Sequence, residues 1–431
     1  MTPGADPPRR RAPTTTAGMA AVRRDTAAHL ASRHKAAARA RTVRRRRAVV
    51  ILATIIVVAG IVAACNAVSS AGPKHKGTSP TTSNTRPTST AAGTTTTTLP
   101  ASFEVGLHTF NWDETGTGIT HVSPTGTALP GRILTTEIRY PTLAGSSSAE
   151  TPNAQPARVG GPYPVIVFAH GFETQPLDYE GLLDTWVKAG FVVVSPIFPD
   201  ESLQAVTAAG GMSNPTIADN LETDVYNEPR DIAYVLKQLA SIGDDPWGSH
   251  LAGVMNLSDV GLAGQSDGAN VVAALSYASG LSSVYASLSP APKAVAVMSG
   301  IAWSYSPSGQ VGTYAATSSS PPLLQIQSDA DGCVSPAEAT DLFSQLQGGL
   351  GAKWFLTLLG AAHLAPYEGV APWAPVVDAV TTRFFELELD WRPGSSSAAA
   401  IAAAGTVQGT GQISTTVNEA TIPQVSPIPG C

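Results

Sequence analysis

The sequence predicts an α/β protein with a doubly wound, mostly parallel sheet, because apolar runs alternate with helical spacing through residues 101–392. Residues 163–169 form a continuous apolar, β-branched run, which is typical of a strand buried on both faces. Helical spacing follows at 179–188, and a second apolar run follows at 191–198. Together they form a right-handed βαβ unit, which implies a parallel sheet.

The rest of the folded region continues this alternation, and no internal repeat interrupts it. Further strands are predicted at 131–140, 258–264, 294–298, 322–327 and 354–359. Further helices are predicted at 229–242, 269–277, 336–347 and 374–387. Between 200 and 228 the pattern dissolves into Gly, Asn, Ala and isolated apolar residues, so this stretch is either a lid or a long loop.

An apolar segment at 48–65 precedes this domain and predicts a membrane anchor or an export signal. Its 18 uncharged residues would span about 27 Å as a helix, at ~1.5 Å per residue, close to a bilayer core of ~30 Å. Residues 1–47 hold 13 of the 26 Lys and Arg and end in four arginines. Because arginines stay on the cytoplasmic side, we expect a basic cytoplasmic segment at 1–47 and the remainder outside.

Two fates of the apolar segment remain open. An uncleaved signal anchor fits the long basic stretch before it, and this is the reading we favour. The sequence Val-Ala-Ala-Cys that ends at Cys65 also fits a lipoprotein signal, in which the cysteine is acylated and everything before it is removed. Both readings predict a cell-membrane protein, single-pass or lipid-anchored, with its folded domain outside the cytoplasm.

Two low-complexity segments flank the folded domain. Residues 66–100 are rich in Ser, Thr, Pro and Gly and are expected to form a disordered linker. Residues 393–431 are similarly rich in Ser, Ala, Gly and Pro and are expected to form a low-complexity tail. A disulfide between Cys333 and Cys431 is expected in an oxidising compartment. The alternative is a buried thiol at Cys333 and an unpaired terminal one.

The charge distribution and the motifs that are missing limit the classes of partner. A basic N-terminal segment followed by an acidic remainder could indicate nucleic-acid binding. The adjoining apolar segment, however, explains the arginines as a signal for membrane topology. We therefore expect no nucleic-acid partner. The sequence has no Cys/His cluster with ligand spacing and no phosphate-binding glycine loop, so neither a metal nor a cofactor is expected.

The segment Gly264-Gln-Ser266-Asp-Gly268 carries the main chemical signal. It fits the Gly-x-Ser-x-Gly elbow, in which a serine stands on a strained turn between a strand and a helix. The predicted strand 258–264 and helix 269–277 supply that setting. The two glycines are needed because a side chain at either position of so tight a turn would clash. Ser266 is therefore the candidate nucleophile.

A serine hydroxyl needs a neighbouring base, which is in turn oriented by an acid. His363 is the only histidine after Ser266, and it lies in a loop just past a predicted strand. The candidates for the acid are Asp267, Asp329, Asp331, Glu338 and Asp341. Asp331 and Asp329 both follow a strand at the edge where open α/β sheets bind ligands, and we prefer Asp331, with Asp329 as a turn residue.

An oxyanion hole requires two backbone N–H donors. One is expected from the amide of Asp267, directly after the nucleophile, and the other from the amide of Phe172, in the loop after the strand 163–169. Gly171 would permit the close approach of that loop. His170 could be a second base, but we expect it to fix the loop through its ring nitrogens.

Taken together, these motifs resemble the α/β-hydrolase superfamily over about residues 130–390. Within it, the chain is similar to the branch that holds bacterial cutinases, polyester hydrolases, chlorophyllases and platelet-activating-factor acetylhydrolases. The motifs that carry the resemblance are Phe-Ala-His-Gly-Phe172, the elbow at Ser266, Ser-Asp-Ala-Asp331-Gly, Gly-Ala-Ala-His363 and 228–236. Gln265 and Asp267 depart from that branch, which usually has a histidine and a bulky apolar residue beside the serine.

The resemblance implies an α/β-hydrolase fold and hydrolysis of carboxylic esters through an acyl-serine, with a lipid or a polyester among the candidate substrates. Trp303 is similar in position to the aromatic residue that lines the acyl subsite of cutinases, and a plain core tryptophan is an equal alternative. A serine peptidase or amidase is the second enzyme hypothesis. A surface binding protein that keeps the fold without activity is the third, and it would expect a broken triad.

Overall fold

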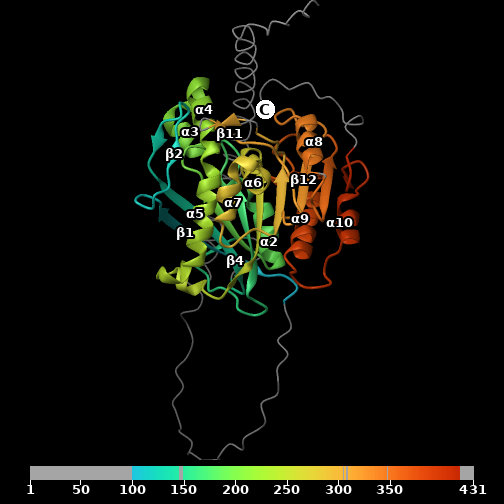
Figure 1. Cartoon of the computed structure of the whole chain (residues 1–431). Helices are drawn as coiled ribbons and strands as arrows, with labels where there is room; N and C mark the ends of the chain where they lie inside the picture. The colour runs from blue at the N-terminus through green and yellow to red at the C-terminus, as the bar shows by residue number, and fades with distance from the viewer. Residues whose placement is uncertain (1–99, 145–148, 304, 307–308, 347, 418–431) are drawn as a thin grey trace, which may run out of the picture.

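A ten-stranded mixed sheet is the centre of the protein in the computed structural model, which describes residues 100–144, 149–303, 305–306, 309–346 and 348–417 (Figure 1). Its strands, in spatial order, are β14 (Gly411–Ser414), β13 (Lys353–Leu358), β12 (Leu323–Ser328), β9 (Ala294–Met298), β8 (Met255–Gln265), β6 (Tyr163–Ala169), β7 (Val192–Ile197), β4 (Ile133–Thr142), β1 (Glu104–Asp113) and β5 (Thr151–Pro152). Two short hairpins lie outside the sheet, β2 (His121–Val122) with β3 (Ala128–Leu129), and β10 (Tyr305–Ser306) with β11 (Gly309–Gln310).

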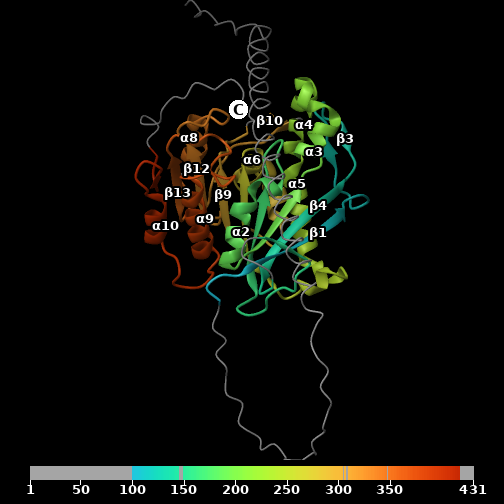
Figure 2. The same ribbon diagram turned by 180° about the vertical axis from the view of Figure 1, so that it is seen from behind.

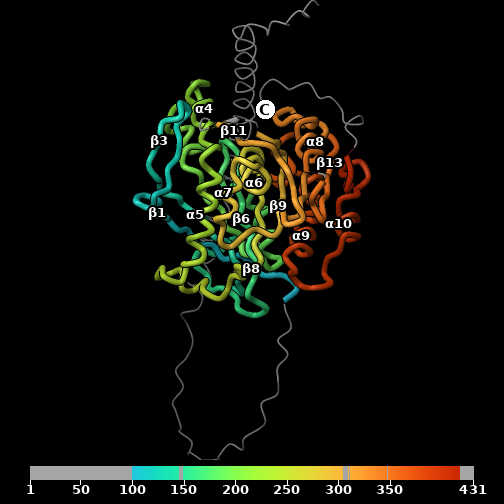
Figure 3. Tube along the Cα trace, in the orientation of Figure 1, coloured from blue at the N-terminus to red at the C-terminus, as the bar shows by residue number. Residues whose placement is uncertain are grey.

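The strands from β7 to β13 run parallel, whereas β4 and β14 pair antiparallel with their neighbours. The expected doubly wound, mostly parallel sheet is therefore confirmed for the described chain. Every residue of β6 and of β9 is buried, as expected for strands covered on both faces. The trace in Figure 3 runs from β1 near one end of the sheet to the C-terminal elements at the other.

Helices cover both faces of the sheet, which Figures 1 and 2 view from opposite sides. Helices α2 and α9 contact each other in one group, and α5, α6 and α7 contact one another in a second. The α-helices are α2 (Glu180–Ala189), α3 (Leu203–Ala209), α4 (Pro215–Glu222), α5 (Glu228–Ala240), α6 (Asp267–Tyr277), α7 (Ser282–Ala286), α8 (Pro336–Gln345), α9 (Ala374–Glu388) and α10 (Ala398–Gly405). The 3-10 turns are η1 (Pro176–Tyr179), η2 (Gly211–Ser213), η3 (Thr223–Tyr226), η4 (Ile242–Asp244), η5 (Gly248–His250) and η6 (Ser279–Leu281).

The stretch 200–228 is largely helical, although its sequence shows no regular period. It holds α3, η2, α4 and η3. Both α-helices begin at a capping side chain, Ser202 for α3 and Asn214 for α4. Val206 and Ala218 bury their side chains against Phe172, so these short helices depend on tertiary contact rather than on an amphipathic pattern of their own.

The expected tail at 393–431 needs correction, because part of it belongs to the folded domain. Helix α10 packs against α9, and β14 adds an antiparallel strand at the edge of β13. Ile401 is fully buried between them. An Ala- and Gly-rich sequence looks like low complexity, but small residues also allow a helix to approach its neighbour closely.

The other predictions for the ends of the chain lie outside the described residues. They concern the segments 1–47 and 48–65, residues 66–99 of the linker, and the cysteines Cys65 and Cys431. Among the residues that the structure does describe, no helix is both long and apolar enough to cross a bilayer.

We expect Ile401→Ala to lower the free energy of unfolding by about 2–5 kcal/mol, because it leaves a cavity beneath α10. The matched control is Val407→Ala, at a side chain that is 38% exposed, which should change stability by less than about 0.5 kcal/mol. Urea denaturation measures both. Equal effects of the two substitutions would contradict the assignment of α10 to the core.

Candidate active site

Ser266 stands on the tight turn between β8 and α6 that the sequence predicts. Its backbone has φ 56° and ψ −120°, a left-handed conformation that is rare for a residue with a side chain. A Cβ atom at Gly264 would lie 2.1 Å from the carbonyl oxygen of Gly268, and one at Gly268 would lie 2.2 Å from that of Ala169. A side chain at either position would collide with the backbone, so both residues must be glycine, as the sequence predicts.

His363 lies within hydrogen-bond distance of the serine. Its Nε2 is 2.9 Å from Ser266 Oγ, and its Nδ1 is 2.8 Å from Asp331 Oδ2. The histidine and the aspartate are buried, whereas the serine is partly exposed. The three side chains come from the loops after β8, β12 and β13, whose carboxyl ends meet at one edge of the parallel sheet. The structure thus brings together the three residues that the sequence selects.

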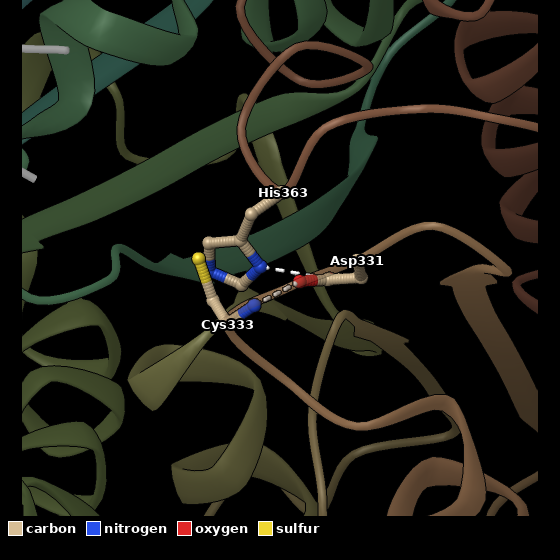
Figure 4. A group of neighbouring side chains, drawn as sticks. All are labelled: Asp331, Cys333 and His363. Atoms are coloured by element: carbon tan, nitrogen blue, oxygen red, sulfur yellow. Dashed lines mark hydrogen bonds and ion pairs between the residues drawn. The ribbon is translucent and has the colours of Figure 1, made fainter. Parts of the chain in front are cut away.

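Asp331 is held by several donors in addition to His363. The amides of Cys333 and Val334 donate to its Oδ1 at 2.9 and 3.0 Å, and Gln327 Nε2 donates to its Oδ2 at 3.1 Å. Figure 4 shows the carboxylate facing both the imidazole ring and the main-chain nitrogen of Cys333. Burial would raise the pKa of Asp331, but His363 and these amides outweigh it and the pKa is lowered. The carboxylate is therefore ionised and fixed in orientation.

Asp329 does more than the turn role expected for it. Its Oδ1 accepts a hydrogen bond of 2.6 Å from the amide of Gly360, and the hydroxyl of Ser328 donates to the carbonyl of Ala361 at 2.7 Å. These two bonds join the loop that carries Asp331 to the loop that carries His363. The sequence could not reveal them, because they connect positions about thirty residues apart.

The loop after β6 packs directly on Ser266. A Cβ atom at Gly171 would lie 2.9 Å from Ser266 Cβ, so glycine is what permits this approach. Phe172 follows Gly171 and buries its side chain, while Asp267 begins α6 directly after the serine. Phe172 is thus the residue after the glycine that approaches Ser266, and Asp267 is the residue directly after the serine in the chain. The carboxylate of Asp267 accepts from Asn270 Nδ2 at 3.3 Å.

His170 fixes this loop, as the sequence predicts, and does not reach the serine. Its Nδ1 donates to the carbonyl of Gly171 at 2.9 Å, and its Nε2 accepts from the amide of Phe198 at 3.0 Å. Burial lowers the pKa of His170 to about 4, despite the bond to Gly171. The ring is therefore neutral at neutral pH, which matches one donating and one accepting nitrogen.

Trp303 lies in the segment after β9 and is partly exposed. Its ring packs edge-on against Tyr226 of η3, with centroids 5.2 Å apart, and its amide donates to the hydroxyl of Tyr314 at 2.9 Å. Trp303 is thus neither a fully buried core residue nor a partner of the three hydrogen-bonded side chains. It connects the segment after β9 to the helical stretch 200–228.

Cys333 is in a disulfide, and the second cysteine lies outside the described residues. Its Sγ lies within 4.8 Å of ligand-type atoms of Asp331 and His363, a combination that could resemble a metal site. A disulfide sulfur has no thiolate to offer a metal, and the carboxylate and imidazole are already bonded to each other. This group therefore does not fit a metal ion.

Glu114, His121 and Asp231 form a second group with metal-like spacing, and all three are buried. His121 Nε2 lies 2.8 Å from Glu114, and the guanidinium of Arg132 pairs with both Asp231 and Asp224. Burial raises the pKa of Asp231 to about 7, and Arg132 opposes that rise. These contacts connect α5 to the residues that follow β1 and precede β4.

A cavity of about 380 Å³ lies apart from the serine. Residues of β12, β13, β14 and α8 line it, among them Phe355 and Ile413, together with Asp329. Neither Ser266 nor His363 lines it. We therefore base the chemistry on the hydrogen-bonded side chains rather than on this cavity.

The comparisons with known proteins give little beyond the geometry. No protein-family model matches the chain, and no curated protein matches it. A solved structure of a ferulic acid esterase from Streptomyces cinnamoneus is similar at 16% identity and a TM-score of 0.45, over 69% of this chain and 95% of that chain. We rest no argument on a likeness of that size.

We expect His170→Gln to flatten the pH dependence of stability. Because the folded-state pKa of about 4 lies below the ordinary value of ~6.5, the unfolded chain binds the proton more tightly, and lowering the pH from 6.5 toward 4 destabilises the fold. Urea denaturation at pH 7 and 4.5 should show that this group costs the wild type about 2–3 kcal/mol. Glutamine can still accept from the amide of Phe198 but does not titrate, so the same loss in the variant would refute the assignment.

Proposed function

We propose that the protein is a serine hydrolase of the α/β-hydrolase superfamily that cleaves carboxylic esters through an acyl-serine. The observation that carries the proposal is the hydrogen-bonded series from Ser266 through His363 to Asp331, with the serine on a strained turn. The ten-stranded sheet with helices on both faces supports the superfamily.

In this mechanism Ser266 Oγ attacks the ester carbonyl carbon while His363 Nε2 takes the hydroxyl proton. Asp331 accepts a hydrogen bond from the Nδ1–H of the ring throughout, which fixes the tautomer and stabilises the imidazolium. Collapse of the tetrahedral intermediate breaks the bond to the alcohol, which leaves with the proton from Nε2. Water then attacks the acyl-serine, with His363 again as base, and releases the acid and Ser266.

The amides of Phe172 and Asp267 would donate to the oxyanion of both tetrahedral intermediates. The close approach of Gly171 to Ser266 supports this role, because it brings the loop after β6 beside the nucleophile. Preorganised amides are effective there because they need no reorientation as the charge develops.

Within the superfamily, we propose the branch of cutinases, polyester hydrolases and platelet-activating-factor acetylhydrolases, and an acyl group from a lipid or a polyester. Trp303 would contact this acyl group, and its partial exposure beside Tyr226 supports the assignment. The helical stretch 200–228 packs on the loop that holds Phe172, so it would border the same substrate.

We further propose that the catalytic domain lies outside the cytoplasm and is tethered by residues 48–65. The disulfide at Cys333 supports an oxidising compartment.

We expect Ser266→Ala to lower kcat/KM for short-chain p-nitrophenyl esters by about 10⁴-fold or more, because the nucleophile is lost. A series of esters of increasing acyl length would define the substrate class, and p-nitroanilide amides would test the peptidase or amidase hypothesis. Unchanged ester turnover in the purified variant would end the proposal. Wild-type protein that folds but is not labelled by a fluorophosphonate probe would favour the binding-protein hypothesis.

We expect the full-length protein to sediment with membranes and to be cut by protease added outside intact cells. Its mass decides between the two anchors, because a lipid-modified N-terminus at Cys65 would replace the signal anchor with a lipoprotein anchor. A soluble full-length chain that is protected from external protease would contradict the tethered location.

A further inference from the structure

Gln265 occupies a central position between the base and the loop after β6. Its side chain is fully buried, directly before the nucleophile at the end of β8. Its Nε2 lies 3.2 Å from Nε2 of His363, and its Oε1 accepts a hydrogen bond of 2.7 Å from the hydroxyl of Tyr179. One amide therefore contacts two parts of the site that are far apart in the sequence.

Tyr179 carries the connection onward to the loop. Its hydroxyl oxygen accepts from the amide of Gly171 at 3.3 Å and lies 3.0 Å from Thr174 Oγ1. Burial raises the pKa of Tyr179 far above the ordinary range, so the phenol keeps its single proton. With that proton directed at Gln265 Oε1, the amide nitrogen of Gln265 is the atom that faces His363.

An amide nitrogen can donate a hydrogen bond but cannot accept one. Its contact with His363 is thus favourable only while Nε2 of the ring holds a lone pair, that is, while the imidazole is neutral with its proton on Nδ1. This is the tautomer that a general base needs, and the hydroxyl of Ser266 approaches the same nitrogen at 2.9 Å. Gln265 therefore favours the form of His363 that can accept the proton of Ser266.

The other titratable groups around the ring leave this position to Gln265. Asp331 faces Nδ1 from the loop after β12, and the disulfide at Cys333 does not titrate. Tyr367 is buried with its pKa raised, and its hydroxyl lies 3.1 Å from Ser299 Oγ. The charges of Asp178 and Glu368 reach Tyr179, whose phenol stays neutral, and Asp267 follows the serine on α6.

We propose that Gln265 is a positioning residue, which holds His363 in the neutral, Nδ1-protonated tautomer and links it through Tyr179 to the oxyanion loop at Gly171. The inference rests on the proposed serine-hydrolase function and explains why this chain carries an uncharged amide beside its nucleophile. Gln265 thereby sets the acid limb of the pH–activity profile. A group at this position that accepted a hydrogen bond from Nε2–H would instead favour the imidazolium.

The decisive variant is Gln265→Glu, which keeps the shape and the acceptor for Tyr179 but places a carboxylate beside Nε2. We expect kcat at pH 7 to fall by about 10–100-fold with KM changed by less than about threefold, because the carboxylate draws the proton onto Nε2. The acid limb of kcat/KM should move up by about one pH unit or more, and activity should recover in part at higher pH.

Two further variants separate positioning from stability. Gln265→Leu removes both hydrogen bonds without adding charge, so kcat should fall with a smaller upward shift of the acid limb. The matched control is Gln325→Glu, at a buried glutamine of β12 whose amide donates to the carbonyls of Gly300 and Ala339. It should lower thermal stability and leave the acid limb in place.

Two readouts keep this test independent of ester turnover. The rate of fluorophosphonate labelling against pH reports on Ser266 and His363 whatever the natural substrate, and the low-field proton resonance of the bond from His363 to Asp331 titrates even in inactive protein. Wild type that labels but cleaves no ester would remove the ester proposal and leave this one standing. An identical pH midpoint for Gln265→Glu and wild type in these readouts would overturn the positioning role.

Discussion

The left-handed backbone of Ser266 is the constraint on which the rest of the site depends. It is tolerated because β8, α6 and the loop after β6 approach within contact distance, which requires glycine at 171, 264 and 268. The strain is balanced by the buried sheet beneath it, in which neighbouring strands cover both sides of β8. This turn places the hydroxyl 2.9 Å from Nε2 of His363.

The orientation of His363 depends on a second set of contacts, between loops rather than within the turn. Asp331 receives two main-chain amides and the side chain of Gln327, and the bond from Gly360 to Asp329 ties its loop to the loop of His363. Each loop follows a parallel strand, so the sheet determines where each loop starts. The polar contacts then determine how the side chains of Asp331 and His363 are oriented. Cys333, whose amide donates to Asp331, is itself in a disulfide.

Ion pairs elsewhere at this edge of the sheet hold neighbouring helices and strands together. Arg132 pairs with Asp224 and Asp231, which joins β4 to η3 and α5, while Phe172 packs against Val206 and Ala218. The stretch 200–228 is therefore held by an ion pair at Asp224 and by apolar contact of Val206 and Ala218 with the loop that carries Phe172. Its position follows from these two attachments, and through them it would influence the loop that carries Phe172.

The βαβ core and the selection of Ser266, Asp331 and His363 follow from the local sequence, because buried strands have a characteristic apolar composition and the elbow implies the chain order of its partners. The tertiary structure decided what depends on residues far apart in the chain. It placed α10 and β14 in the domain, folded 200–228 into short helices, and linked Gln265 to Tyr179 and Asp329 to Gly360. A local pattern records which face of an element is apolar, whereas a hydrogen bond between distant loops leaves no periodic signal.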